Sequence, residues 1–305
     1  MNAKSALTAT ESEHALALDH LVINTRFELP AAAQVFEALG FTLTPQGRHT
    51  LGSINHLMVF ERDYLELIGL PTDNGPLRQE VLDSAVGIDG LVYQTDSAAR
   101  LHAALTASDM PVTPVQTFSR PVELDGTRHD ATFRTLRHPS DAFEAGRVYY
   151  CQHLTPELVW RASWQQHANG VDALVALVVV STRPEHDARA HARAALGQAQ
   201  RTHAGWTVAG RYFRLDVVHP TVYAERYGDL ASDPKGRDSF FGAIVLRTGR
   251  PDALRRCVDA LGERVRARSY RGEVPGDNAN ISASGLTVAV PEFNTLLDFS
   301  FLPER

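Results

Sequence analysis

The chain has 305 residues, of which 44% are hydrophobic and 22% are charged, and its formal net charge at pH 7 is −6. These values are typical of a globular protein and leave no room for extensive disorder. The mild acidity argues against a nucleic-acid-binding face, which would be basic, and a chain of this length usually forms about two domains.

The first elements along the chain indicate a repeated module. A short apolar strand followed by an amphipathic helix occurs four times, and three of the four helices end at a glycine, which suits the left-handed C-terminal position. After the first helix, three more apolar stretches complete a βαβββ order. The strands are expected at 18–24, 87–93, 171–178 and 240–246, the helices at 30–40, 98–110, 185–197 and 251–262, and the three further stretches at 41–44, 56–60 and 64–70.

The four modules predict two domains of two modules each. Residues 161–170 are the main polar interruption between the second and third modules and are expected to form a linker. The N-terminal domain is therefore expected at 14–160 and the C-terminal domain at 171–305. Further polar stretches inside the domains are expected to be loops, at 71–76, 125–129, 228–237 and 272–280.

Cysteine usage and the N-terminal residues indicate a soluble cytoplasmic protein. Cys151 and Cys257 are the only cysteines, so neither a disulfide framework nor a CxxC metal site is available. Residues 1–13 lack the apolar run of a secretion signal, and the chain has no apolar stretch of 18 residues. Nearly all positive charge is arginine, which is typical of a GC-rich bacterial genome. No membrane or nucleic-acid partner is expected.

His20 and Glu66 are the clearest candidate site residues. Because side chains alternate along a strand, His20 and Asn24 share one face while the apolar residues between them face the covering helix. Glu66 alternates with two leucines in the same way, and an unpaired buried carboxylate would be costly. An imidazole and a carboxylate on one face suit a divalent cation. The alternatives are a hydrogen-bonded core histidine and an ion pair between Glu66 and an arginine such as Arg134.

Three segments carry a family resemblance. The opening Leu-Asp-His-Leu-Val at 18–22, the turn and strand at 48–55 and the strand at 64–68 resemble the glyoxalase/bleomycin-resistance/dioxygenase superfamily, also called vicinal oxygen chelate proteins. More narrowly, they resemble its glyoxalase-like domain branch. The resemblance is specific over residues 16–160 and rests on module order alone in the C-terminal half. It implies an α+β fold in which four βαβββ modules pair into two tandem domains with cup-shaped mixed sheets.

The resemblance also implies a divalent metal (Zn, Ni, Mn or Fe) in the cup, held by the first and last strands of each module. His20 and Glu66 correspond to these ligands in the first module. Gly90 stands at the other first-strand position and has no donor to offer. The site is therefore expected to have at most three protein ligands plus water.

The last strand of the second module, 148–154, leaves two candidates for the third ligand. Alignment with the strand that carries Glu66 places Gln152 in the cup and turns Cys151 towards the helices. A one-residue bulge would instead bring His153 into the cup.

Other residues are expected to line the cup and contact the substrate, namely Asn24, Tyr64, Tyr93, Arg134 and Tyr150. The basic segment 129–138 is either a solvated hairpin or an anion-binding rim. The C-terminal half offers only Asp298 in its last strand, so we expect a degenerate domain that serves packing, homodimerisation or closure of the active cup.

These observations favour a small-molecule enzyme of lyase, isomerase or hydrolase type, with Glu66 as metal ligand or general base. The alternative is a metal-free binding or drug-sequestering protein of the same fold. Extradiol dioxygenation needs two histidines and a carboxylate around Fe(II), and Gly90 weakens that prediction. Motifs of nucleotide-binding proteins, α/β-hydrolases and zincins are missing from the sequence.

Overall fold

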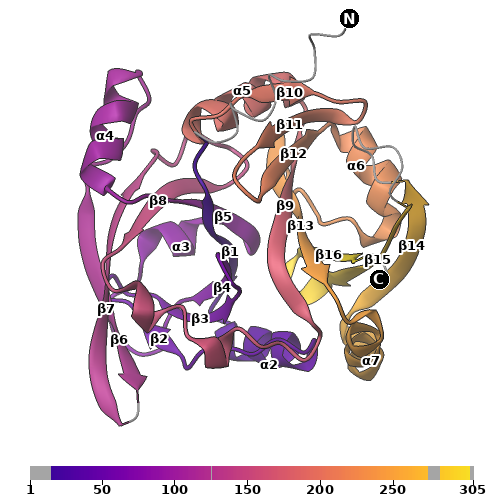
Figure 1. Cartoon of the computed structure of the whole chain (residues 1–305), viewed down its shortest axis with the longest axis horizontal. Helices are drawn as coiled ribbons and strands as arrows, with labels where there is room; N and C mark the ends of the chain where they lie inside the picture. The colour runs from indigo at the N-terminus through magenta and orange to yellow at the C-terminus, as the bar shows by residue number, and fades with distance from the viewer. Residues whose placement is uncertain (1–14, 125, 274–281, 303–305) are drawn as a thin grey trace, which may run out of the picture.

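The computed structural model describes residues 15–124, 126–273 and 282–302. The N-terminal segment 1–13, the predicted first residue of the N-terminal domain and most of the predicted loop 272–280 lie outside the described residues. The described strands form two curved sheets that stand side by side (Figure 1). No described helix is both long enough and apolar enough to cross a bilayer.

The first sheet has eight strands in the order β2-β3-β4-β1-β5-β8-β7-β6. At its centre β1 runs antiparallel to β5, and each of them has the last strand of its own module as a parallel neighbour. Helices α2 (Leu29–Ala38) and α4 (Ala98–Ala107) follow β1 and β5. The strands are β1 (Leu18–Arg26), β2 (Gly47–Arg48), β3 (Ile54–Val59), β4 (Tyr64–Gly69), β5 (Gly87–Gln94), β6 (Gln116–Leu124), β7 (Thr127–Arg137) and β8 (Arg147–His153).

The second sheet repeats this topology, in the order β10-β11-β12-β9-β13-β16-β15-β14. Its helices α5 (Pro184–Ala194) and α7 (Pro251–Leu261) follow β9 and β13. The predicted α+β fold, with four βαβββ modules paired into two cup-shaped mixed sheets, is confirmed. The strands are β9 (Val171–Ser181), β10 (Ala199–Arg201), β11 (Gly205–Ala209), β12 (Arg214–Val218), β13 (Ser239–Thr248), β14 (Arg266–Glu273), β15 (Ser282–Val290) and β16 (Thr295–Phe301).

The strand predicted at 41–44 is wrong, because these residues are irregular and the strand that follows α2 is the short β2. Phe41 is buried against Phe299 of the second sheet, and the backbone N–H of Thr42 donates to Nδ1 of His167. The segment therefore contacts the second sheet and the connection between the two sheets, and it meets β3 through a hydrogen bond from the N–H of Thr44 to the carbonyl of Leu57 (2.9 Å).

The two sheets share one hydrophobic core on their helix-covered faces. Buried residues of both sheets belong to one continuous cluster, and the hydroxyl of Tyr150 in β8 donates to the carbonyl of Ala194 at the end of α5 (2.9 Å). The cup faces carry separate, smaller clusters. This arrangement leaves each cup pointing away from the shared core.

Each cup is partly filled by a short helix that the sequence analysis did not predict. Helix α3 (Gln79–Asp83) lies within the curve of the first sheet (Figure 1), where Val81 is buried among cup residues. Helix α6 (Pro220–Tyr227) fills the second cup with Tyr223 and Tyr227, both buried. The hydroxyl of Tyr223 donates to the carbonyl of Gly242 in β13 (2.8 Å), so aromatic side chains close that cup.

The first sheet curves until its two edge strands approach one another. The backbone N–H of Thr50, just after β2, donates to the carbonyl of Ser119 in β6 (3.3 Å). The cup is therefore bounded by strands on nearly every side. Its polar residues face one another across a narrow interior.

Candidate functional site

A cavity of about 30 Å³ lies at the centre of the first cup. Its polar lining is His20, His49, Asn55, Glu66, Arg78 and Arg120, and its aromatic lining includes Tyr64, Phe118, Phe133 and Tyr149. A space of this size holds one or two water molecules. An organic molecule therefore enters only when the side chains or the α3 segment that close the cavity move.

The structure brings His20 and Glu66 together from the neighbouring strands β1 and β4. The register pairs Val22 with Glu66, and Nε2 of His20 lies 3.6 Å from Oε2 of Glu66. Both side chains are buried, and Oε1 of Glu66 accepts a hydrogen bond from Nδ2 of Asn55 (2.6 Å).

Glu66 is ionised at neutral pH. Burial raises its pKa, but the nearby His20 and His49, the hydrogen bond from Asn55 and the charge of Arg78 together outweigh burial and lower that pKa below its usual value. Burial lowers the pKa of His49 to about 3, although the carboxylate of Glu66 acts in the opposite direction. The cavity therefore holds a buried carboxylate beside hydrogen-bonding groups and two arginines, Arg78 and Arg120.

Asp19 enters the cup through a β-bulge. The register between β1 and β5 shifts between Leu18 and His20, so Asp19 is the extra residue and does not turn towards the helices as strict alternation would require. Its Oδ1 lies 2.5 Å from Nδ1 of His20 and 3.1 Å from Nε2 of His153. Sequence reasoning missed Asp19, because nothing in the pattern of apolar residues marks the bulge.

Asp19 sets the orientation of His20. Burial raises the pKa of Asp19, but His153 and His20 outweigh burial and hold this pKa well below its usual range, so the carboxylate only accepts hydrogen bonds. Nδ1 of His20 therefore donates to Asp19. Nε2 faces Oε2 of Glu66 at 3.6 Å and the hydroxyl of Tyr149 at 3.4 Å.

The last strand of the second module differs from the predicted arrangement. Gln152 faces the start of α4, where its Oε1 accepts from the N–H of Ala98 (3.1 Å), so the expectation that it lies opposite Glu66 is wrong. Cys151 lines the cavity, so the expectation that it faces the helices is also wrong. His153 lies on the cup side but bonds to Asp19.

The register between β5 and β8 explains why Gln152 does not lie opposite Glu66. Tyr149 pairs with Val92 in β5 as Glu66 pairs with Val22 in β1. Tyr149 therefore occupies the position in the second module that corresponds to Glu66. Gly90 packs against Val22, since a Cβ atom there would lie 2.7 Å from a methyl carbon of Val22.

Three residues expected to line the cup lie elsewhere. Tyr93 and Tyr150 stack on one another (6.0 Å between ring centroids) in the core on the helix-covered side. They follow the helix-facing alternation of β5 and β8, which corrects both expectations. Arg134 is exposed on β7, so it neither lines the cavity nor pairs with Glu66.

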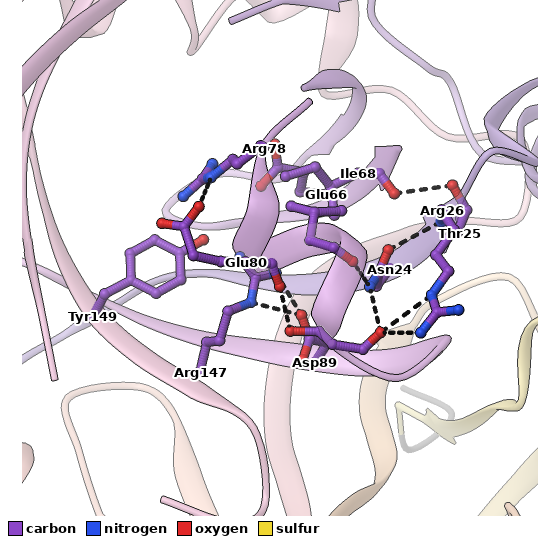
Figure 2. Close-up of polar contacts among 12 residues, drawn as sticks. Asn24, Thr25, Arg26, Glu66, Ile68, Arg78, Glu80, Asp89, Arg147 and Tyr149 are labelled. Atoms are coloured by element: carbon purple, nitrogen blue, oxygen red, sulfur yellow. Dashed lines mark hydrogen bonds and ion pairs between the residues drawn. The ribbon is translucent and has the colours of Figure 1, made fainter. Parts of the chain in front are cut away.

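Tyr64 and Asn24 do face the cup. Tyr64 stacks on His20, with 4.3 Å between ring centroids and 13° between ring planes. Nδ2 of Asn24 donates to the carbonyl of Val81 in α3 (2.8 Å), so Asn24 holds the covering helix and does not line the cavity (Figure 2 shows its position).

Arg78 and Arg120 were not foreseen as cavity residues. Arg78 precedes α3, and its backbone N–H donates to the carbonyl of Gly52 (3.0 Å). Arg120 reaches inward from β6 past Gly47, where a Cβ atom would lie 2.8 Å from Nη1 of Arg120. Both arginines lie in segments remote from His20 and Glu66 in the sequence, where no local pattern marks them as cup residues.

Neither of the two residues predicted as alternatives for the third metal ligand joins His20 and Glu66. His20 and Glu66 offer two donors, but Gln152 faces away and His153 is bonded to Asp19. A different group meets a geometric requirement for metal binding: ligand atoms of Asp19, Cys151 and His153 all lie within 4.8 Å of one another.

Comparison with known proteins identifies the family to which the chain belongs. Residues 18–196 match the family model described as a glyoxalase-like domain, which covers the first sheet and continues through α5. A search of curated proteins by sequence returned no match.

Solved structures match nearly the whole chain. A hypothetical protein from Staphylococcus aureus has a TM-score of 0.58 at 13% identity, with 93% of this chain and 99% of that chain covered. A mutant of 4-hydroxymandelate synthase from Streptomyces coelicolor has a TM-score of 0.53 at 12% identity, with 94% and 92% covered. A xylose isomerase-like TIM barrel/4-hydroxyphenylpyruvate dioxygenase fusion protein has a TM-score of 0.55 at 10% identity, with 94% and 50% covered. At these identities the likeness concerns the fold.

Proposed function

Because the chain belongs to the glyoxalase-like domain family, we propose that it is a small-molecule enzyme of lyase or isomerase type, with its active site in the first cup. The observation that carries this proposal is the pair of His20 and Glu66, buried together beside a cavity and 3.6 Å apart. An ionised carboxylate with a lowered pKa and a neighbouring imidazole suit proton transfer.

Glu66 is the proposed general base. It would take a proton from a carbon atom next to a carbonyl group, and the electron pair of the broken C–H bond would move onto the carbonyl oxygen. The proton on Glu66 could pass to Nε2 of His20, because the carboxylate of Asp19 at Nδ1 stabilises the resulting imidazolium. Return of the proton to a different carbon gives an isomerase, and loss of a leaving group gives a lyase.

If the cup takes up a divalent cation, we propose Asp19, Cys151 and His153 as its ligands. A buried thiol, carboxylate and imidazole form a donor set that suits zinc. Nδ1 of His153 is buried without a hydrogen-bond partner among the described residues, so this atom is open to a further partner, whereas Oδ2 of Asp19 lies 3.0 Å from Nε2 of His153. Such a cation would supply electrostatic stabilisation of developing negative charge.

A second candidate function is small-molecule binding without chemistry. It is favoured by the aromatic side chains that line the cavity, among them Tyr64, Phe118 and Tyr149, since such lining is typical of ligand pockets. The dioxygenase alternative has less support, because the ligand atoms that converge closely enough for an ion among the described residues are those of Asp19, Cys151 and His153, a set that has one histidine and lacks Glu66.

Exchange of carbon-bound hydrogen distinguishes the two functions. The protein is incubated in D₂O with a panel of small carbonyl compounds, and loss of the C–H signal is followed by proton NMR. The proposed enzyme accelerates exchange for at least one compound, Glu66→Gln abolishes that acceleration, and Glu61→Gln, at an exposed position, retains it. Binding without exchange for every compound bound would favour the binding function.

A further inference from the structure

The cavity in the first cup is lined by two arginines, Arg78 and Arg120, and by one carboxylate, that of Glu66. Four arginines lie in or beside the cup. Two have close carboxylate partners: Nε of Arg147 donates to Oδ2 of Asp89 (2.6 Å), and Arg137 forms an ion pair with Glu80. Figure 2 shows Arg147 with Asp89 and, on the other side of Tyr149, Arg78 near Glu80.

Arg120 has no ion-pair partner within 4.0 Å among the residues that the structure describes. Its side chain lines the cavity, the residue is 3% exposed, and Nη2 is buried without a hydrogen-bond partner. A buried guanidinium that lacks a counter-ion is costly, because burial removes its hydration. Burial accordingly lowers the pKa of Arg120.

The guanidinium of Arg78 has only slightly more hydrogen-bond and ion-pair partners than that of Arg120. It is 7% exposed, its Nε lacks a hydrogen-bond partner among the described residues, and the nearest carboxylate oxygen, Oε2 of Glu80, is 3.6 Å away. Glu80 already pairs with Arg137. Arg78 therefore also brings donors to the cavity that the chain itself does not fully use.

Arg78 and Arg120 share the cavity with one ionised carboxylate, that of Glu66. Glu66 is engaged by Asn55 and faces His20, and it lies beyond ion-pair distance of either arginine. Two buried cations therefore surround a single anion, and a second anion would balance the charge. A planar carboxylate fits the parallel N–H groups of a guanidinium better than a spherical ion does.

We infer that Arg78 and Arg120 bind the carboxylate of a small organic acid, and that this acid is the substrate class of the first cup. The inference rests on the proposed function, because it places the reactive carbon of the same molecule beside Glu66. Arg78 directly precedes α3, which covers the cup, so binding of the carboxylate by Arg78 would also hold this segment closed.

The test measures affinities for acetate, lactate and benzoate against acetamide, lactamide and benzamide, with inorganic phosphate as a further probe. Calorimetry and melting temperatures are recorded for the wild type, Arg120→Gln, Arg120→Lys and Arg255→Gln, the last a control at a partly exposed helix position outside the cup. We expect the wild type to bind at least one carboxylate at least tenfold more tightly than its amide. We expect Arg120→Gln to lose that preference, Arg120→Lys to keep part of it, and the control to keep all of it.

Stability without ligand separates a binding role from a structural role. Arg120→Gln removes a cation that lacks a partner, so its melting temperature should equal or exceed that of the wild type. A lower melting temperature or a failure to fold would show that Arg120 is structural and would overturn the inference. Equal affinity for acids and amides, unchanged carboxylate binding by Arg120→Gln, or binding of phosphate alone would also overturn it.

Glu66→Gln distinguishes this inference from the proposed function. It removes the negative charge that repels a carboxylate, so it should bind the acid at least as tightly as the wild type while catalysing no exchange. Carboxylate binding without exchange in the wild type would refute the enzyme and keep the inferred anion site. Exchange of neutral ketones without carboxylate binding would keep the enzyme and refute the anion site.

Discussion

Asp19 and His20 are consecutive residues of one strand, yet their side chains share a 2.5 Å hydrogen bond inside the same cup. The bulge in β1 makes this contact, because it removes the alternation that would separate the two side chains. It also brings Asp19 to His153, 134 positions further along the chain. The protonation and orientation of His20 therefore depend on a residue that lies outside the regular strand pattern.

Asp19→Asn tests this dependence. The variant leaves two buried histidines without their charged acceptor, so we expect the free energy of unfolding at pH 7 to fall by about 3–5 kcal/mol. The folded pKa of Asp19 is lowered, so its contribution is complete above the unfolded value of 3.8 and is lost as pH falls through the folded value. The difference from the wild type should therefore shrink below about pH 4 in urea titrations.

Asp141→Asn, at an exposed position, serves as the control and should leave unfolding unchanged. An Asp19→Asn variant as stable as the wild type at pH 7 would contradict a charged role for Asp19.

Asp63 should make the stability of the protein depend on pH in the opposite direction. It is buried where the turn between β3 and β4 meets β9, and its Oδ1 accepts from the N–H of Leu174 (3.3 Å). Burial raises its pKa from 3.8 to about 7. The folded protein therefore holds the proton more tightly than the unfolded chain does, and stability is greatest below about pH 4, declines as pH rises towards 7 and is level above it.

Asp63→Asn should remove this decline, because it keeps an acceptor for Leu174 and has no charge to bury. At pH 8 the variant should be more stable than the wild type by up to about 4 kcal/mol, from 1.36 kcal/mol for each unit of the pKa shift. Unfolding at a series of pH values measures this. A variant and wild type whose stabilities run parallel from pH 4 to pH 8 would contradict it.

Gly90 is expected to tolerate no side chain. A Cβ atom there would lie 2.7 Å from a methyl carbon of buried Val22, so Gly90→Ala should destabilise the protein by about 1–3 kcal/mol. Val22→Ala should restore part of that loss in the double variant. Gly197→Ala is the control, because its Cβ would lie an ordinary 3.4 Å from the nearest atom. Equal melting temperatures for the two alanine variants would refute close packing at Gly90.

The strands and helices of the modules can be predicted well from the sequence, because the spacing of apolar residues shows which face of each element is buried. The pattern around Leu21 and Leu65 is enough to put His20 and Glu66 on one face, where the structure also has them. It is not enough to place Gln152, because the register of β8 turns Tyr149 and Cys151 inward instead.

The remaining site residues depend on tertiary structure. Arg120 enters the cup only because the edge strands of the sheet meet, and Arg78 only because a five-residue helix folds over the cup. Neither event leaves a periodic signal in the sequence. The same holds for the bulge that brings in Asp19.

The central claim is that His20 and Glu66 act as one unit in proton transfer. Its most direct test is the rate of carbon–deuterium exchange for the wild type, His20→Ala, Glu66→Gln and the double variant, with a compound that the wild type exchanges. Residues that act together are not additive. We predict that each single variant loses most of the rate and that the double variant is little slower than the slower single variant. Losses that multiply in the double variant, or a single variant that keeps the wild-type rate, would contradict the account.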